Sequence, residues 1–557
     1  MKYLSTLLAT ALLCLAIATP ADAAEREWGV NFWAHDYYTT DAVFVDATRV
    51  FSYGPKDPRP DPATEQGIPI DATRRVFSAL NAYPDGTYKL RYDGAGRIEI
   101  KGGGQILPDS IRQKNGHTYA DVRITPGEDY VEMYFHHENP DSDPIRNVRL
   151  ICPGYDVDTD QIFRDEAWKR LRPFTTLRFM DWNWANKSNA GSWEQRRLED
   201  DFFQTAGFGN RTEEGGMAYE LMAGICNEGG KDMWMCVPHT ADEQYIQEMA
   251  KLLHEELDPE LTLYIELSNE LWNFSQGPEL AKRMMGEDWS YSSKEMDSLY
   301  KGAVAPKLLQ ISRAFKEAFA DRPGKLKVVL AGQISNAWHM KQTYEGWAEA
   351  GVEPGEVIDA IAIAPYMHAG HNRETVDQLI DDMRKDARGK MAEGIRSHAE
   401  YARQADADLI AYEGGQHVFF RNVAKDELID QVQDDPRMRE LYQILAEEWE
   451  KAGGGLFVHY TYAGYPWGLL PTGASEGSVK YDAVMKLLLP EGDATLDGEV
   501  TFADFEVLEQ HFGQSGWWMN GDFNGDRQVN AEDLELLREN LSGLTTQQEQ
   551  RVEKLAD

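Results

Sequence analysis

Residues 264–273 (YIELSNELWN) decide the fold, because an apolar run rich in branched and aromatic residues ends abruptly in polar side chains. Residues 409–416 (LIAYEGGQ) have the same form. Runs of this length and composition are typical of buried β-strands. Between about residue 28 and 463, similar runs alternate with longer stretches of helical period. This alternation predicts strand–helix units around a parallel sheet, which places the chain in the α/β class.

The strand-like runs number eight, and eight strand–helix repeats predict a closed (β/α)8 barrel of the TIM type. The expected strands are 28–33, 175–182, 232–238, 261–269, 325–332, 359–366, 408–414 and 456–463. The clearest helical stretches between them are 242–257, 300–320, 375–404 and 427–451. The barrel domain is expected to span residues 24–490.

The interval between the first two expected strands departs from this alternation of strands and helices. Residues 88–92 and 97–100 alternate around the turn at 93–96, and further strand-like runs follow up to residue 151. We expect a small β-sandwich inserted after the first strand, over about residues 50–155, with the first barrel helix at 160–171. An independent N-terminal domain is the alternative, but residues 29–33 before it have the composition of a barrel strand.

The N-terminus predicts export. Residues 1–3 carry a positive charge, residues 4–18 are apolar, and Ala21-Asp22-Ala23 provides small residues for cleavage, so residues 1–23 are expected to be a signal peptide. A membrane anchor is the alternative, but the apolar run is short for a bilayer and Pro20 follows it directly. The mature protein is therefore expected to be secreted, either free or attached to a surface, and without a membrane span.

The composition of the chain excludes several classes of protein. The 557 residues are 42% hydrophobic and 27% charged, which excludes wholesale disorder and a multispan membrane protein. The net charge of −38 repels phosphate backbones, so no nucleic-acid partner is expected. After cleavage Cys152, Cys226 and Cys236 remain, an odd number, so at most one disulfide can form, and their apolar surroundings indicate buried thiols.

Two similar twelve-residue patterns follow residue 490. Calcium takes six to eight oxygen ligands, and a twelve-residue loop offers them at positions one, three, five, seven, nine and twelve. The expected metal ligands are Asp493, Thr495, Asp497, the Glu499 carbonyl and Asp504 in the first loop, and Asp522, Asn524, Asp526, the Gln528 carbonyl and Asp533 in the second.

Each loop is followed by a helical run, and residues 491–543 resemble a type I dockerin module. The resemblance implies structural Ca²⁺ and docking onto a cohesin-like partner or a cell-surface scaffold. Thr495 departs from the usual Asp or Asn and is expected to weaken the first site. Arg527 replaces Gly at position six and is expected to need a left-handed backbone. Residues 544–557 form a polar tail to which no role is assigned.

Two glutamates end strands of the predicted barrel, where the chemistry of such barrels is located. Glu270 follows the fourth strand and Glu413 the seventh. A proton donor and a carboxylate nucleophile roughly 5 Å apart cleave glycosidic bonds with retention of configuration. Residues 28–490 resemble the large clan of retaining TIM-barrel glycoside hydrolases, which carries Asn-Glu on strand four and Glu on strand seven. The resemblance implies that Glu270 is the acid/base, Glu413 the nucleophile and Asn269 the partner of the sugar 2-hydroxyl.

Other residues fit a site for a polysaccharide. Arg178 is expected to pair with the nucleophile, Tyr366 to hydrogen-bond Glu413, and Trp467 to form the floor of the sugar subsite. His239 and Trp272 are expected to contact substrate, and sugar rings also stack on tryptophans, for which the strand-end candidates are Trp182, Trp184, Trp272 and Trp338.

Two alternatives stay open. The first is a metal-dependent hydrolase that uses three histidines near strand ends, His239, His368 and His417. These histidines lack the spacing typical of metal ligands, so no catalytic cofactor is expected. The barrel can also be a non-catalytic carbohydrate-binding or scaffold-attached protein, with both glutamates as inert acids on its rim. Glu266 is expected either to pair inside the barrel or to lie beneath the site.

Overall fold

A computed structural model describes residues 26–33, 41–53, 63–126, 129–188, 190–204, 216–273, 276–289, 298–419 and 426–556. The predicted signal peptide, residues 1–23, lies outside these ranges. Of the long segment after the fourth barrel strand, residues 274–298, the structure describes residues 276–289 and 298.

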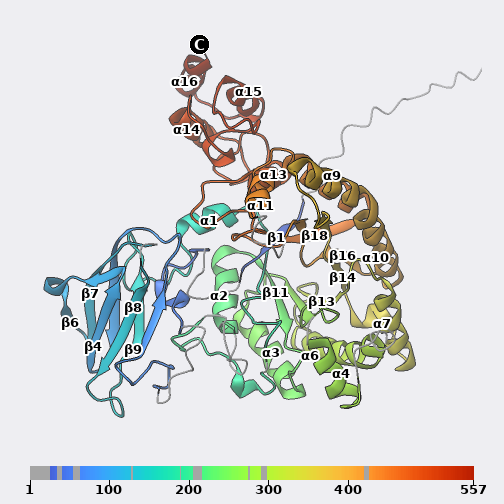
Figure 1. Cartoon of the computed structure of the whole chain (residues 1–557), viewed down its shortest axis with the longest axis horizontal. Helices are drawn as coiled ribbons and strands as arrows, with labels where there is room; N and C mark the ends of the chain where they lie inside the picture. The colour runs from blue at the N-terminus through green and yellow to red at the C-terminus, as the bar shows by residue number, and fades with distance from the viewer. Residues whose placement is uncertain are drawn as a thin grey trace, which may run out of the picture.

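Eight parallel strands close into a barrel, as predicted (Figure 1). Their register closes the ring at β1, where Gly29 is paired with Thr176 on one side and with Val458 on the other. Each observed strand falls within an expected run or extends it by two residues at most. In barrel order the strands are β1 (Trp28–Asn31), β10 (Thr176–Arg178), β11 (Asp232–Val237), β12 (Leu263–Leu267), β13 (Leu326–Ala331), β14 (Ala360–Ile363), β16 (Asp408–Ala411) and β18 (Gly454–His459).

Helices follow the strands and cover the outside of the barrel (Figure 1). α3 shows why they form: the Asp242 side chain caps its first turn by accepting from the Tyr245 amide at 2.7 Å, and apolar residues at helical spacing are buried. The helices of this part are α1 (Asp165–Leu171), α2 (Tyr219–Gly229), α3 (Glu243–Glu256), α4 (Gln276–Met285), α6 (Ala305–Ala318), α7 (Trp338–Glu349), α8 (Pro354–Val357), α9 (Val376–Asp386), α10 (Ala392–Gln404), α11 (Asp426–Gln433), α12 (Met438–Lys451) and α13 (Val479–Leu488). Single π-turns, η4 (Tyr300–Val304) and η5 (Ala387–Met391), precede α6 and α10.

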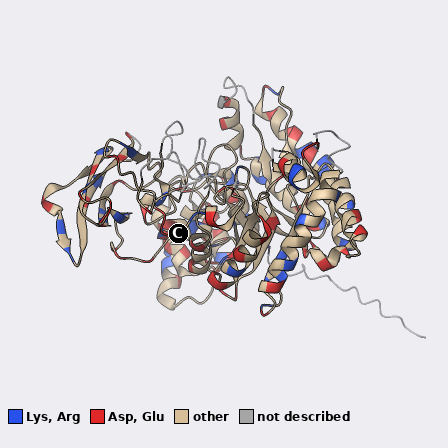
Figure 2. Ribbon diagram, turned by 90° about the horizontal axis from the view of Figure 1, so that it is seen from below, with Lys and Arg blue, Asp and Glu red and all other residues tan. Residues whose placement is uncertain are grey.

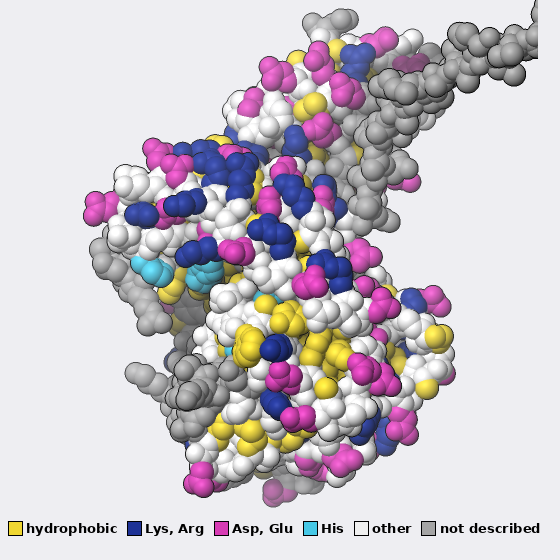
Figure 3. Space-filling model, turned by 90° about the vertical axis from the view of Figure 1, so that its right-hand side faces the viewer, with side chains coloured by type: hydrophobic (Ala, Val, Ile, Leu, Met, Phe, Trp, Pro, Cys, Tyr) yellow, Lys and Arg dark blue, Asp and Glu magenta, His cyan; other side chains and the backbone are white. Residues whose placement is uncertain are grey.

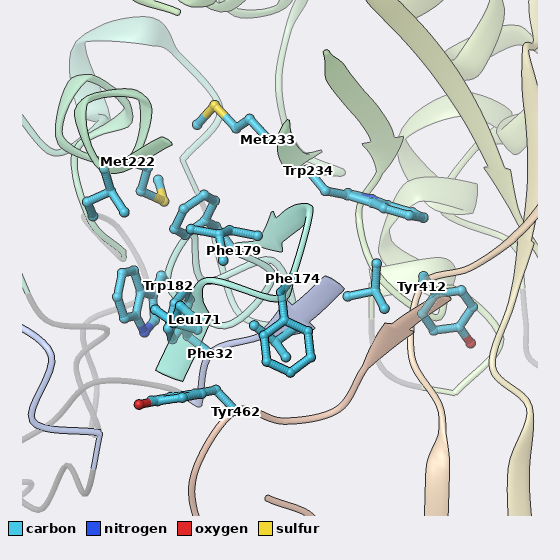
Figure 4. Close-up of a cluster of buried hydrophobic side chains, with 14 of the residues drawn as sticks. Phe32, Leu171, Phe174, Phe179, Trp182, Met222, Met233, Trp234, Tyr412 and Tyr462 are labelled. Atoms are coloured by element: carbon cyan, nitrogen blue, oxygen red, sulfur yellow. The ribbon is translucent and has the colours of Figure 1, made fainter. Parts of the chain in front are cut away.

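Aromatic side chains fill the space between the first strands and their helices (Figure 4). Phe32 stacks on Trp182 with ring centroids 4.4 Å apart, and Phe179 packs against both. Trp182 is 1% exposed, so the prediction that it is a sugar platform is wrong: the ring belongs to the core. Cys152, Cys226 and Cys236 are buried, as expected, and all three are free.

The chain between β1 and β10 contains two antiparallel sheets, seen on the left of Figure 1. One has the order β2-β8-β4, and the other has the order β5-β7-β3-β9 with β6 paired to β7. The strands on either side of Gly94 do not form a hairpin, because β3 pairs with β7 and β9 whereas β4 pairs with β8. The strands are β2 (Arg75–Ser78), β3 (Gly86–Asp93), β4 (Gly96–Gly102), β5 (Gly104–Ile106), β6 (Arg112–Lys114), β7 (His117–Ile124), β8 (Val131–His137) and β9 (Arg146–Ile151).

Three helices form the C-terminal part, at the top of Figure 1. They are α14 (Phe502–His511), α15 (Ala531–Asn540) and α16 (Thr546–Ala556), so most of the polar tail is helical. This part is tied to the barrel. The Trp518 amide donates to Asp482 Oδ1 of α13 at 3.4 Å, and Arg172 donates to the Thr495 carbonyl at 3.2 Å.

Charges of both signs are interspersed over the outer helices in Figure 2, although acidic residues predominate in the chain as a whole. Among the described residues, the structure contains no helix with the length and apolarity needed to cross a bilayer.

Candidate active site

A cavity of about 460 Å³ opens at the C-terminal ends of the barrel strands. Six of the predicted site residues line it, and Arg178 lies beneath them and contacts two of the six. The six are Asn269, Glu270, Trp272, Tyr366, Glu413 and Trp467. The rest of the described lining consists of Met180, Asn186, Asn273, Gln333, Ile334, Ser335, Ala364, His368, Asp386, Lys390, Met391, Tyr412, His417 and Tyr460.

Glu270 stands on a turn just after β12. Its φ is +41°, a left-handed value that is uncommon outside glycine, and Ser268 has a φ of +55°. The Tyr412 hydroxyl donates to Oε1 at 3.0 Å, and Asn273 Nδ2 donates to Oε2 at 2.9 Å. The turn therefore aims a half-buried carboxyl into the cavity, with one donor on each oxygen.

Glu413 follows β16 and is 6% exposed. Arg178 Nη1 donates to Oε1 at 3.0 Å, and the Tyr366 hydroxyl donates to Oε2 at 2.9 Å. Burial raises the pKa of Glu413, and the nearby charge of Glu270 raises it further, whereas Arg178 and Tyr366 act in the opposite direction. Glu413 and Glu270 line the same cavity, so both carboxyls can reach a substrate bound there.

Arg178, fully buried at the end of β10, connects the floor of the site. Besides Glu413, its guanidinium donates to Asn31 Oδ1 at 3.0 Å and to Asn269 Oδ1 at 2.9 Å. It also pairs with Glu266 at 2.9 Å, so Glu266 is a charge partner beneath the cavity, in line with its expected position. Burial lowers the pKa of Arg178, but the charges of Glu266 and Glu413 outweigh burial and keep it raised.

The tyrosines of the site are hydrogen-bond donors. Burial and the neighbouring carboxylates raise the pKa of Tyr366 and Tyr412 well above the usual value. Both phenols therefore stay protonated at any physiological pH. Each can hold a carboxyl group without supplying a proton to the reaction.

Some predicted contacts are not brought to the cavity. His239 does not belong to the described lining; it is 3% exposed, and its Nε2 lies 3.1 Å from Glu279 Oε2 of α4. Trp184 is 6% exposed, with the Lys187 ammonium over its ring. Trp338 is absent from the described lining and is 45% exposed at the start of α7. α7 lies at the right of Figure 1, the side that Figure 3 views, and hydrophobic side chains gather on that surface.

The three histidines proposed as an alternative metal site are not gathered. His368 and His417 face each other across β15 (Tyr366–His368) and β17 (Gly415–His417) with ring centroids 4.7 Å apart, whereas His239 is elsewhere. In the part of the chain that the structure describes, no three His, Cys, Asp or Glu side chains are arranged to hold a metal ion.

Sequence reasoning missed several residues of the site. Asn31 ends β1 and holds Arg178, Tyr412 precedes Glu413 and holds Glu270, and the Tyr460 hydroxyl donates to Asp181 Oδ2 at 3.0 Å. All of them stand at or just beyond strand ends, where polar residues interrupt apolar runs. The sequence offered that signal, but it did not show which of these residues face each other.

The two C-terminal loops have the backbone that the sequence suggests. Gly498 and Arg527, both at position six, have φ values of +87° and +72°, so Arg527 does adopt the left-handed conformation. In the first loop Asp493 accepts from the Gly498 amide at 2.8 Å, and in the second Asp522 accepts from the Arg527 amide at 2.9 Å. The carboxylates of both loops thus accept N–H groups of their own loops.

Neither the scan against protein-family models nor the search of curated proteins found a match. Three solved structures that match parts of this chain are glycoside hydrolases. A GH51 arabinofuranosidase from Xanthomonas axonopodis pv. citri is 11% identical, with a TM-score of 0.37 over 59% of this chain and 67% of that one. A family 51 α-L-arabinofuranosidase from Bifidobacterium longum is 12% identical, with a TM-score of 0.40 over 61% of this chain and 70% of that one.

A two-module structure from Clostridium thermocellum, with the CBM22-1 and GH10 modules of an endo-1,4-β-D-xylanase, matches a larger part of this chain. It covers 81% of this chain and 96% of its own, at 9% identity and a TM-score of 0.35. Similarity at this level carries no information on the reaction or the substrate. The functional argument therefore depends on the geometry of the cavity.

Proposed function

We propose that this protein is a secreted glycoside hydrolase that cleaves O-glycosidic bonds of a polysaccharide by a retaining double displacement. One observation carries the proposal: Glu270 and Glu413 line the same cavity but have different partners. Glu413 is held by a cation and a phenol, whereas Glu270 is held by a phenol and an amide. Two carboxyls in unlike surroundings are what an acid and a nucleophile require.

In the first step Glu270 gives its proton to the leaving oxygen while Glu413 attacks the anomeric carbon. The glycosidic C–O bond breaks and a glycosyl ester of Glu413 forms. In the second step Glu270 takes a proton from water, the water oxygen attacks the anomeric carbon, and the ester bond breaks. Arg178 and Tyr366 stabilise Glu413 as an anion, both before attack and when it leaves.

The test is hydrolysis of β-linked glucans, mannans, xylans and galactans by the wild-type chain and by Glu270→Gln and Glu413→Gln. We expect each substitution to lower kcat by at least about 10³-fold, and Glu393→Gln on the exposed side of α10 to change nothing. NMR should show that the product first formed has the same anomeric configuration as the substrate. Undiminished hydrolysis by either cavity variant would remove the proposed roles. Binding of a glycan by the wild type without hydrolysis would favour the non-catalytic barrel.

We also propose that the C-terminal loops bind structural calcium. The donors are all oxygens, and the left-handed residue at position six of each loop provides the sharp turn that such a loop needs. In the described structure Asp493 and Asp522 accept amides of their own loops, and the carboxylates of these loops are not arranged as a metal site, so calcium binding would require their side chains to turn toward the ion. Asp493, Thr495, Asp497, the Glu499 carbonyl and Asp504 would hold one ion, and Asp522, Asn524, Asp526, the Gln528 carbonyl and Asp533 the other. Bound calcium would supply charge neutralisation and loop order, and it takes no part in glycoside cleavage.

The calcium loops support a dockerin-like role, so we propose attachment to a cohesin-like partner or a cell-surface scaffold. Titration of the full chain with a type I cohesin domain, with and without EGTA, tests this. Calcium-dependent binding is expected, and lack of binding at high protein concentration would contradict it.

Export and the inserted module complete the proposal. We infer that residues 1–23 are removed on secretion. N-terminal sequencing of the exported protein tests this and should find residue 24 first.

We also infer that the two sheets between β1 and β10 form one inserted β-sandwich. Close packing between the sheets supports this: a Cβ at Gly104 of β5 would lie 2.7 Å from the side chain of Ile100 in β4 and 3.0 Å from that of Val131 in β8.

A further inference from the structure

A buried polar network lies behind Trp467. The carbonyl oxygen of Pro466 accepts two hydrogen bonds of 2.9 Å, one from Lys480 Nζ and one from Gln416 Nε2. Lys480 comes from α13 and is 4% exposed, and Gln416 comes from β17 and is 1% exposed. Two segments distant in sequence therefore converge on one backbone atom next to Trp467.

Gln433, at the end of α11, completes the network. Its Oε1 accepts from Lys480 Nζ at 2.6 Å and from Gln416 Nε2 at 3.2 Å. Gln416 Oε1 in turn accepts from the Val418 amide at 2.7 Å, which fixes the backbone on the far side of His417. Burying an amine is unfavourable unless its N–H groups find acceptors. Here the acceptors are a side-chain amide and the Pro466 carbonyl.

The network is adjacent to the substrate cavity. Trp467 and His417 both line the cavity, with ring centroids 6.1 Å apart. Trp467 also stacks on Trp33 at 5.8 Å and an interplanar angle of 16°, and it packs against Phe419 at 5.3 Å. Each residue of the pair Trp467 and His417 directly follows a residue of the network.

We propose that Lys480 is a positioning residue for substrate: through the Pro466 carbonyl it holds the Trp467 ring in the cavity wall, at the distance from His417 that a sugar ring requires. Lys480 does not touch the cavity and acts through the Pro466 carbonyl. The inference rests on the proposed glycoside hydrolase function, because the wall matters only if a glycan occupies the cavity. Burial lowers the pKa of Lys480 to about 7. Both the ammonium and the amine can donate to a carbonyl, so the contact persists on either side of neutrality.

The first test is a double-mutant cycle on a glycan that the wild type hydrolyses. We expect Lys480→Met to raise KM about tenfold and to change kcat by less than about twofold, because sugar binding weakens while the two glutamates keep their partners. Trp467→Ala should raise KM at least as much. The double variant should match Trp467→Ala alone, because Lys480 acts only through that ring.

The matched control is Lys486→Met, which removes a lysine of the same helix whose Nζ pairs with Glu491 at 2.7 Å on the surface. It should leave both kinetic constants unchanged. A fall in kcat with unchanged KM in Lys480→Met, or effects that multiply in the double variant, would overturn the proposal. If Lys480→Met fails to fold, Gln416→Leu is the alternative, because it removes the other hydrogen bond to the Pro466 carbonyl. It should likewise raise KM and leave kcat nearly unchanged.

The second test does not depend on hydrolysis. Hydrogen exchange of the segment 461–470 should be at least several-fold faster in Lys480→Met than in the wild type and in Lys486→Met, while exchange in β12 stays unchanged. Equal exchange in all three proteins would overturn the anchoring role. Faster exchange together with an inactive wild type would leave the anchor in place and instead show that the proposed reaction is wrong.

Discussion

Tyr366 and Glu413 are joined by a hydrogen bond of 2.9 Å, from the phenol hydroxyl to Oε2. The bond favours the ionised carboxylate, against burial and the charge of Glu270, which raise the pKa of Glu413. Because Glu413 must be ionised to attack, activity is expected to fall as the pH drops through its pKa.

Tyr366→Phe should therefore move the acid limb of the pH profile of kcat/KM to higher pH. A hydrogen bond to a charged group is worth about 1.5–3 kcal/mol, so a shift of roughly one pH unit is expected. Initial rates between pH 4 and 9 measure it. Tyr344→Phe removes a hydrogen bond to the Tyr401 carbonyl outside the cavity and should leave the limb in place. A shift toward lower pH would contradict the assignment.

Asn269→Ala should reduce kcat/KM by about 10²-fold on a substrate with a 2-hydroxyl, since bonds to this group strengthen in the transition state. Its Oδ1 is held by Arg178 and its Nδ2 reaches Asn186 at 3.1 Å, which leaves one amide hydrogen for the sugar. On the matching 2-deoxy substrate the loss should be at most a few-fold. Equal losses on both substrates would show that Asn269 only supports the local structure.

Chelation with EGTA should lower the midpoint of thermal unfolding of the C-terminal part. A ligand at 100 times its Kd stabilises the folded state by about 2.7 kcal/mol. Asp497→Ala should weaken this calcium response, whereas Glu499→Ala should preserve it, because only the carbonyl of residue 499 is a proposed ligand. Differential scanning calorimetry of the full chain, with and without EGTA, measures this change in the unfolding midpoint. Identical scans with and without EGTA would count against calcium in these loops.

Gly414→Ala should destabilise the barrel and disturb Glu413. A Cβ at this position would lie 2.4 Å from Cζ of the Phe457 ring in β18, so the strand or the ring must move. Overpacking of this kind costs about 1–3 kcal/mol. Gly389→Ala is the control, since a Cβ there meets nothing within 4 Å and alanine favours helix by about 0.5–1 kcal/mol. Urea unfolding should give opposite signs for the two, and equal stability of both variants would contradict the packing argument.

The predicted barrel and the placement of Glu270 and Glu413 required little beyond local pattern. Buried parallel strands are nearly continuous apolar runs, and a polar residue after such a run lies at the catalytic end of a barrel. The prediction for His239 had the same basis, but the structure places its ring against Glu279 of α4 and not in the described lining of the cavity, because a residue just after a strand can face a neighbouring helix as readily as the cavity. Trp182 shows the same weakness, since its ring turned into the core.

The sequence by itself determined the eight-strand repeat, the two glutamates at strand ends and the duplicated loops, because each depends on residues close together in the chain. Only the tertiary structure decided that Arg178 joins Asn31, Glu266, Asn269 and Glu413, and that Lys480 reaches the carbonyl before Trp467. Those contacts join segments up to 235 residues apart. Barrel closure and side-chain direction bring such segments together, and neither leaves a periodic trace in the sequence.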